Sequence, residues 1–394
     1  MTKPPVPPPA AARAGAWEKQ GTGEAAFFAF IPRPLPPNPA LLLDDQLQRR
    51  LESASLALGR LDGIGRLLPG PDELLHSYVR KEAVLSSQIE GTQSSLADLV
   101  MHENSAAPGV PLSDVREVSN YIAAMHCGIE MLKSLPLSLR LIREVHQVLV
   151  TGSRGTRQNP GEFRRSQNWI GGPTPRDAIF VPPPAHEVMP ALSALENFIH
   201  TDNLPALIVA GLAHAQFETI HPFLDGNGRV GRMLIPLIFV SNGILERPWL
   251  YMSLHFKRHR SQYYELLQRV RTHGEWEPWI AFYLEGVASV ADDAVRKITE
   301  LIALFERDRG RVNGSRSGSL YQRVAVQSNL DLYEHLRGRI AVRIPEAAAA
   351  LGTTKPTIAR AIEVLVELGI AVEVTGKSRN RLWVYQEYLD VLNR

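Results

Sequence analysis

The sequence predicts a mainly α-helical protein that ends in a small domain of helices and short strands. Three observations carry this prediction. Apolar residues recur at helical spacing through most of the chain from residue 41 onward. A single segment rich in glycine and proline, residues 160–184, interrupts that spacing. After residue 330, three short helical patterns are followed by two runs of β-favouring residues.

The composition limits the classes of protein that the chain can represent. A length of 394 residues suits two or three domains, and Lys+Arg 43 against Asp+Glu 41 is too balanced for a protein that binds nucleic acid or anionic membrane along its whole length. No apolar stretch approaches the length of about 20 residues that a membrane span needs, and no export pattern is present. The only cysteine, Cys127, cannot form an internal disulfide. We therefore expect a cytoplasmic protein that does not contact a membrane.

The first 40 residues differ in character from the remainder. Ten of the 29 prolines lie there, and proline removes backbone donors and fixes φ. We therefore expect residues 1–40 to form an extended, partly disordered, Pro-rich N-terminus.

The next two segments are predicted to be helical. Apolar stripes indicate an N-terminal helical region at 41–110 and a helical core at 111–300. Within the core, residues 206–220 are apolar on nearly every side, which is typical of a helix at the centre of a bundle. Two β runs, 168–170 and 178–181, predict a hairpin that stands off this helical body.

The chain is expected to end in a separate domain. Arginine, glycine and serine accumulate near residues 306–323, so a linker is predicted at 301–330. Residues 331–394 then follow the order of a winged helix-turn-helix domain. DNA binding there is less favoured than a protein contact or dimerisation, because the domain has nearly equal numbers of acidic and basic residues. Its candidate phosphate contacts are Lys355, Arg360, Lys377, Arg379 and Arg381.

The densest chemical signal is the segment 221–232, directly after the predicted buried helix. Pro222 should end that helix and leave the imidazole of His221 at the mouth of a turn. Glycines and the start of the next helix can bring backbone amides close to an anion, and Arg229 and Arg232 share one helical face. Asp225 supplies an oxygen ligand for Mg²⁺. The pattern predicts a nucleotide-phosphate site beside an imidazole.

Other interpretations of this segment are weaker. Residues 226–231 also satisfy G-x-G-x-x-G, but a dinucleotide site requires a preceding strand, whereas a long helix is expected here. A polar turn between helices would not need a base, a carboxylate, glycines and two arginines together.

A second signal comes from the predicted helix that begins at Pro71. On a helical projection, Glu90 shares one narrow stripe with apolar residues that include Val79 and Ala83. A carboxylate that faces the core needs a cationic partner, so the sequence predicts an arginine beside Glu90.

Residues 221–232, HPFLDGNGRVGR, match the Fic signature H-x-F-x-[DE]-G-N-G-R-x-x-R, and the chain resembles Fic proteins from about Phe28 to Tyr283. The resemblance implies a Fic-type helical bundle with a β-hairpin flap. It also implies transfer of AMP from ATP to protein Ser, Thr or Tyr hydroxyls, with release of pyrophosphate. Relatives also include enzymes that remove AMP or transfer other phosphate-containing groups.

The resemblance assigns roles to individual residues. It implies that His221 is the general base, that Phe223 anchors the loop and that Asp225 holds Mg²⁺. ATP would contact the segment from Gly226 to Arg232, with Arg229 near the β-phosphate and Arg232 near the γ-phosphate. The full ATP-binding set is Gly226, Asn227, Gly228, Arg229, Val230, Gly231, Arg232 and Tyr263, the last resembling the tyrosine of the adenine pocket.

Residues 86–91, SSQIEG, also match the inhibitory motif [ST]-x-x-x-E-[GN] of Fic proteins. The resemblance implies that Glu90, together with Ser86, pairs with Arg232 and occupies the γ-phosphate position. Target proteins would dock on the flap. A homodimer stays open, as does the alternative of a nucleotide-sensing transcriptional regulator that binds DNA through its winged helix.

Overall fold

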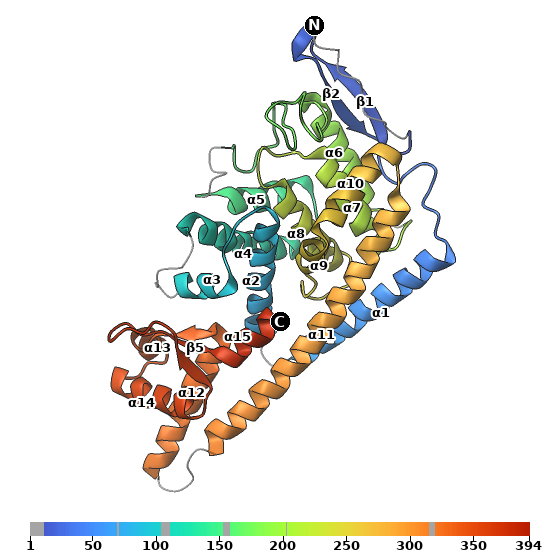
Figure 1. Cartoon of the computed structure of the whole chain (residues 1–394). Coiled ribbons are helices and arrows are strands. Elements are labelled where there is room, and N and C mark those ends of the chain that lie inside the picture. The colour runs from blue at the N-terminus through green and yellow to red at the C-terminus, as the bar shows by residue number, and fades with distance from the viewer. Residues whose placement is uncertain (1–11, 69–70, 104–110, 153–157, 202, 315–319) are drawn as a thin grey trace.

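The computed structural model describes residues 12–394 except 69–70, 104–110, 153–157, 202 and 315–319, and it is mainly helical (Figure 1). In chain order its elements are β1 Gly15–Gln20, a 3-10 turn Gly23–Ala25, β2 Phe27–Pro32, α1 Asp45–Leu67, α2 Pro71–Ile89, α3 Leu96–Glu103, α4 Leu112–Leu132, α5 Leu139–Val150, α6 Ala185–Ile199, α7 Ala206–Ile220, α8 Asn227–Ser241, α9 Ser253–Arg258, α10 Arg260–His273, α11 Trp276–Gly314, α12 Leu320–Arg339, β3 Ala341–Val342, α13 Ile344–Ala350, α14 Lys355–Glu367, β4 Ala371–Glu373, β5 Trp383–Tyr385 and α15 Gln386–Asn393. None of the helices among these residues is long and apolar enough to cross a bilayer.

Helix α7 lies at the centre of the helical body, as its apolar sequence predicts. Every residue from Leu207 to Ile220 is buried, and α7 packs against α6, α8, α10 and α11. Gly211 allows the close approach of α11, because a Cβ there would lie 2.7 Å from the ring of Tyr283. The loop that follows α7 is therefore held against a rigid core.

The N-terminal segment contains a β-hairpin that the sequence analysis did not predict. Strands β1 and β2 pair antiparallel from Gly15 opposite Pro32 to Gln20 opposite Phe27. The hairpin packs on the segment expected to be the flap: Phe30 donates its N–H to the carbonyl of Val181 at 2.9 Å, and the rings of Trp17 and Phe30 lie 5.9 Å from that of Phe180. Residues 1–11 of the expected extended N-terminus lie outside the described residues.

The flap has less β structure than the sequence predicted. Its two expected runs meet only at an isolated bridge between Ile170 and Phe180. Four prolines around these runs, at 173, 175, 182 and 183, remove donors that a longer ladder would need.

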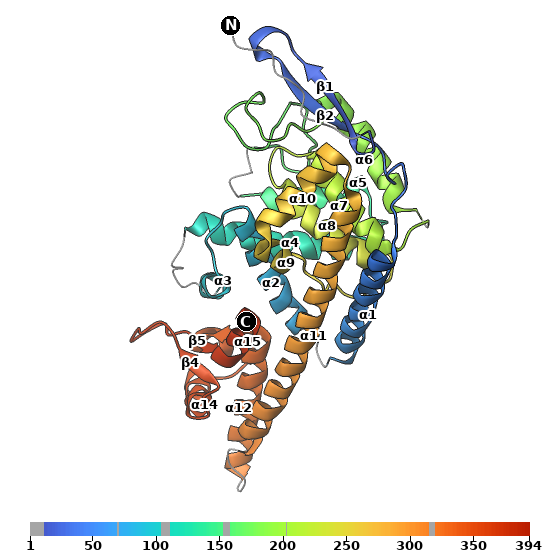
Figure 2. The ribbon, with the colours of Figure 1, turned by 45° about the vertical axis from the view of Figure 1, so that its right-hand side comes forward.

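The predicted linker at 301–330 is wrong over its described part, because α11 continues without a break through residue 314. The reason is a buried cluster that local composition does not reveal. Asp308, 1% exposed, accepts hydrogen bonds from Arg307 at 2.9 Å, Arg311 at 3.0 Å and the Tyr385 hydroxyl at 2.7 Å. With 39 residues at about 1.5 Å each, α11 reaches from the core to the C-terminal domain, with α1 packed along it (Figures 1 and 2).

The C-terminal elements occur in the order expected of a winged helix-turn-helix, with β3, β5 and β4 forming one antiparallel sheet. The domain also contacts α2, a contact that the sequence analysis did not predict. The Tyr388 hydroxyl on α15 donates to Ser77 Oγ at 2.8 Å, and α12 packs against α2 as well. Helix α2 therefore lies between the core and the C-terminal domain.

Candidate active site

His221 occupies the junction between α7 and the loop that follows it. It caps α7 in the left-handed region, with φ 49° and ψ 60°, and its N–H donates to the carbonyl of Phe217 at 2.9 Å. A non-glycine residue rarely adopts this conformation, so the surroundings must hold it. Two side chains of the flap segment do so by donating to its carbonyl: Arg164 Nε at 2.9 Å and Asn168 Nδ2 at 3.2 Å.

The loop 222–228 is closed by its own side chains. Asn227 accepts the N–H of Phe223 and donates to the carbonyl of the same residue, both at 2.8 Å. The fully buried Phe223 ring stacks on His146, with centroids 3.6 Å apart. The structure thus places the Phe223 side chain where an anchor is expected, and it uses the Asn227 side chain, predicted to bind phosphate, to shape the loop.

Asp225 faces the opening of the loop, and its side chain is 40% exposed. One carboxylate oxygen accepts the N–H of Gly226 at 2.6 Å. The backbone carbonyl oxygen of Asp225 is 3.0 Å from His146 Nε2, while His146 Nδ1 accepts the N–H of Gly161 at 3.0 Å. Burial lowers the pKa of His146 to about 4, so this imidazole is neutral and Nε2 carries its proton. A buried imidazole on α5 therefore fixes the backbone at Asp225.

The two arginines of the motif differ in their surroundings. Arg229 is buried, and its guanidinium lies 3.4 Å both from Glu117 on α4 and from Asp225. Arg232 has a 1% exposed side chain and pairs with the carboxylate of Glu90 at 2.7 Å. The cationic partner expected for Glu90 is therefore Arg232.

Ser86 and Glu90 contact Arg232 from the C-terminal end of α2. Arg232 Nε donates to Ser86 Oγ at 2.8 Å, and Nη2 donates to the carbonyl of Ser86 at 3.1 Å. Glu90 lies one residue beyond the end of α2, with its side chain 38% exposed. Burial alone would raise the pKa of Glu90, but Arg232 and then Arg229 and His221 hold it below its usual value. The contact is thus an ion pair at neutral pH.

Gly228 brings the two halves of the site together. A Cβ at Gly228 would lie 2.2 Å from Glu90 Oε1 and 3.0 Å from Arg232 Nη1. Only a residue without a side chain allows the carboxylate to approach the start of α8 this closely. Gly226, with φ 80°, provides the left-handed turn that begins the helix.

Besides the buried Arg232, three residues predicted to bind ATP do not line the opening. Val230 is buried in α8, and Gly231 faces α7, where a Cβ would lie 2.5 Å from Glu218 Oε1. Tyr263 is 1% exposed, its hydroxyl bonds to His214 Nε2 at 2.9 Å, and its ring stacks on Phe256. The adjacent Tyr264 is 43% exposed. Burial and then Glu90 raise the pKa of Tyr264.

The opening is a cavity of about 300 Å³ between the end of α2, α4 and the loop. Its lining residues are Glu90, Gly91, Thr92, Glu117, His221, Leu224, Asp225, Gly226, Asn227, Gly228 and Arg229.

His221 is held neutral by its surroundings. Burial and then the charges of Arg271 and Arg164 lower the pKa of His221 to about 4. Its Nδ1 is buried and has no hydrogen-bond partner in the described part of the chain. Arg271 itself donates to the carbonyl of Glu218 at 3.1 Å and lies over the ring of Phe180 at 4.0 Å. The imidazole is therefore a free base at neutral pH.

Glu117, His146, Arg164 and Arg271 were not identified from the sequence. They belong to α4, α5, the flap segment and α10, and none forms a recognisable motif with its own neighbours in the chain. An isolated carboxylate on an apolar helical stripe, such as Glu117 next to Val118 and Tyr121, is a signal that could have identified one of them.

Residues 48–130 match the family described as Fic/DOC family N-terminal, and residues 136–239 match the Fic/DOC family. The protein adenylyltransferase Fic of Drosophila sechellia is 26% identical over 310 residues, or 74% of this chain and 58% of that protein. The Drosophila grimshawi protein of the same name is 29% identical over 210 residues, or 52% of this chain and 40% of that protein. The chain thus spans less than two thirds of either relative.

A crystal structure of a Fic family protein from Desulfovibrio desulfuricans G20 has a similar fold. Its TM-score is 0.56 at 17% identity, over 88% of this chain and 97% of that one. The mainly helical fold class is confirmed.

Proposed function

Residues 48–130 and 136–239 of this chain belong to the Fic/DOC family, and from that premise we propose that the protein transfers AMP from ATP to hydroxyl side chains of proteins. The observation that carries the proposal is the neutral imidazole of His221 beside a 300 Å³ cavity whose other wall is the amino end of α8. Backbone N–H groups at a helix N-terminus favour an anionic ligand, worth roughly 0.3–2 kcal/mol for each contact. The names of the curated relatives support the same chemistry.

In the proposed reaction the target hydroxyl of Ser, Thr or Tyr attacks the α-phosphorus of ATP. The new bond joins that oxygen to phosphorus, the bond to the bridging oxygen breaks, and pyrophosphate leaves. His221 takes the hydroxyl proton, a role for which a neutral ring is required. Arg164 and Asn168 keep the imidazole in position because both donate hydrogen bonds to the backbone carbonyl of His221.

Asp225 is the residue that would hold Mg²⁺. Its partly exposed carboxylate fits this role, because Mg²⁺ is usually bound through one or two carboxylates together with substrate phosphates. The ion would neutralise phosphate charge when bound. Among the described residues, no group of three or more His, Cys, Asp or Glu could form a metal site without the phosphates.

We further propose that Glu90 inhibits the enzyme within the same chain. Its carboxylate forms an ion pair with the guanidinium of Arg232 and lies against Gly228, so a γ-phosphate and Glu90 would compete for the same cation. Removal of AMP, which the family resemblance left open, would use the same side chains.

Targets are proposed to dock on the flap. Ile179 is 72% exposed and Trp169 is 39% exposed, so this segment presents apolar side chains close to the Arg164 and Asn168 contacts of His221. An extended segment could add main-chain hydrogen bonds there.

DNA binding is not part of the proposal. Arg360 and the wing residues Lys377, Arg379 and Arg381 are exposed, but so are Glu363 and Glu367 on the same helix as Arg360. This mixture gives no single-sign surface for a phosphate backbone.

Intact-mass analysis tests the proposed reaction. Incubation of the Glu90→Gly variant with ATP and Mg²⁺ should add the mass of AMP to the protein. Addition of the mass of a phosphate group would instead indicate a kinase-like orientation of the nucleotide. If neither the mass of the enzyme nor the mass of a supplied protein target changed, the proposal would be contradicted.

The pH dependence of transfer should follow His221. Because the base must be neutral, the rate is lost as pH falls through its folded pKa of about 4. In the Glu90→Gly variant, kcat/KM for ATP should therefore change by less than about twofold between pH 8 and 6, whereas an unperturbed imidazole with a pKa of about 6.5 would lose most of its activity by pH 5.5. An inflection of kcat/KM near pH 6.5 that is due to the titration of His221 would contradict this expectation.

A further inference from the structure

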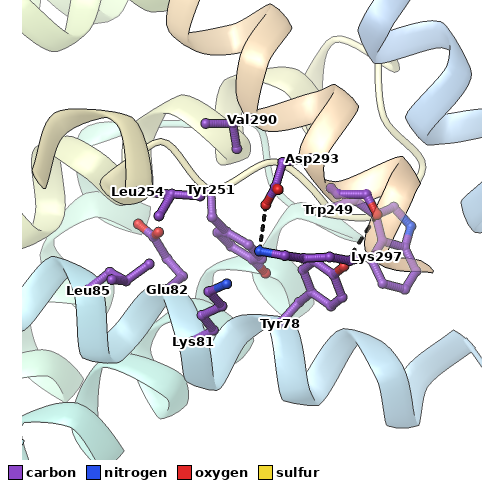
Figure 3. A pocket seen from close by; sticks show the side chains of 11 residues that line it. Tyr78, Lys81, Glu82, Leu85, Trp249, Tyr251, Leu254, Val290, Asp293 and Lys297 are labelled. Atoms are coloured by element: carbon purple, nitrogen blue, oxygen red, sulfur yellow. Dashed lines mark hydrogen bonds and ion pairs between the residues drawn. The ribbon is translucent and has the colours of Figure 1, made fainter. Parts of the chain in front are cut away.

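A small cavity lies outside the loop described above, between α2 and α11 (Figure 3). Its volume is about 30 Å³, enough for about two water molecules. Two lysines from different helices reach into it: Lys81 from α2 and Lys297 from α11. Neither was identified in the sequence as a functional residue, and neither contacts His221 or Arg232 in the proposed reaction.

One of the two amines is paired with a carboxylate. The Lys297 side chain is 2% exposed, and its Nζ lies 2.7 Å from Asp293 Oδ2 one turn earlier on α11. Lys81 is partly exposed at the edge of the cavity. Because Asp293 is paired with Lys297, a second ammonium group on Lys81 would lie beside a like charge in a half-buried place, and deprotonation of the more accessible amine removes this repulsion.

The surroundings of Lys81 favour its neutral form. Burial and then the Lys297 amine lower the pKa of Lys81 to about 7; Asp293 opposes them, and Arg258 on α9 adds a still smaller lowering effect. Glu82 on α2 also lines the cavity, but its carboxylate accepts hydrogen bonds from Ser253 and Tyr121, and burial raises its pKa to about 7. A large share of Lys81 is therefore a neutral, nucleophilic amine at neutral pH.

Hydrogen-bond donors for an anion are already present beside this amine. The hydroxyl of Tyr251 is buried and has no hydrogen-bond partner among the residues that the structure describes. Lys297 Nζ forms an ion pair with Asp293, and as an ammonium group it has three N–H donors. In Figure 3 the polar ends of Lys81, Lys297 and Tyr251 point toward one another. An anionic group attached to Lys81 would meet both donors.

The size of the cavity limits the group that Lys81 can carry inside it. A volume of about 30 Å³ holds two or three heavy atoms. Carbon dioxide meets this limit, reacts with neutral amines and not with ammonium groups, and leaves a negatively charged product.

We propose that Lys81 is a site of reversible carbamylation by carbon dioxide. The lone pair of Lys81 Nζ forms a bond to the carbon, one C=O π bond becomes a C–O⁻ bond, and a proton leaves the nitrogen for solvent. The carbamate is held by the ammonium of Lys297 and the hydroxyl of Tyr251. The inference does not depend on AMP transfer, because none of these residues belongs to the proposed machinery.

Trapping of the carbamate tests this inference on the full chain. The protein is incubated at pH 7.5 with ¹³C-labelled bicarbonate, treated with an ethylating oxonium salt and mapped by peptide mass spectrometry. We expect a labelled ethyl carbamate on Lys81, at an occupancy that rises with bicarbonate concentration. Lys133, whose side chain is 66% exposed, serves as the internal control and should carry at least about tenfold less label.

Two variants test whether the cavity is responsible. Lys297→Met removes the counter-charge, and Tyr251→Phe removes one donor while it keeps the ring; each should lower labelling of Lys81 severalfold, with folding checked by thermal unfolding. The proposal is overturned if Lys81 carries no label in the folded wild type. This holds also if an inorganic anion is what occupies the cavity. Equal labelling of Lys81 and Lys133 overturns it as well. So does unchanged labelling of Lys81 in both folded variants, Tyr251→Phe and Lys297→Met.

Discussion

Glu90→Gly should raise AMP transfer by about tenfold or more, because the substitution frees Arg232 for the nucleotide. In the native chain the carboxylate holds the guanidinium at 2.7 Å and lies against the backbone of Gly228. A competing contact of this kind corresponds to a coupling free energy of about 1–3 kcal/mol, or 5- to 150-fold in affinity. Initial rates of self-labelling with radiolabelled ATP, measured at several ATP concentrations, give the effect directly.

The matched control for this experiment is Glu103→Gly. Glu103 pairs with Arg80 at 2.6 Å, so its substitution also breaks a short carboxylate–guanidinium contact of α2, but away from the loop. It should leave the rate of labelling within about twofold. Equal rates in the wild type and in Glu90→Gly would remove the inhibitory role of Glu90 from the account.

His221→Ala should reduce AMP transfer by about 10²- to 10⁴-fold, the usual contribution of a general base. The substitution is best made in the Glu90→Gly background, where the starting rate is high. ATP binding should persist, because the loop is closed by the contacts of Asn227 and by the stacking of Phe223 on His146, not by the imidazole of residue 221. Calorimetric titration with ATP and Mg²⁺ separates loss of chemistry from loss of binding.

A histidine elsewhere on the surface provides the comparison. His126 on α4 is exposed, and its replacement by alanine should leave transfer unchanged. Transfer that survives His221→Ala in a folded protein would show that another group takes the hydroxyl proton.

The sequence predicted the loop 221–232 and the need of Glu90 for an arginine partner because both depend on local rules, whereas Arg232 as that partner was implied only by the family resemblance. A Pro after a His ends a helix, glycines permit close approaches, and a carboxylate on a buried stripe demands a cation. These rules act within one helix or turn, so they can be read without knowing the remainder of the fold.

The elements that were missed depend on distant contacts. The β1–β2 hairpin is stabilised by Phe180, about 150 residues later, and α11 continues through its Arg- and Gly-rich end because Tyr385 and Arg311 satisfy the buried Asp308. The burial of Tyr263 has a similar cause, since one residue on α10 rotates a side chain by about 100° and packing on Phe256 decides that the ring of Tyr263, not that of Tyr264, is buried.

The position of α2 determines how Glu90 can leave Arg232. Near its start this helix is fastened on two sides, by Tyr388 to Ser77 at 2.8 Å and by the Tyr78 hydroxyl to the carbonyl of Ala294 at 3.3 Å. A rigid displacement of the whole helix would break both fastenings at once. Unwinding of its last turn alone would carry Ser86 and Glu90 away while the C-terminal domain stayed in place, so amide hydrogen exchange on nucleotide binding should accelerate at residues 86–91 and remain slow at residues 76–80.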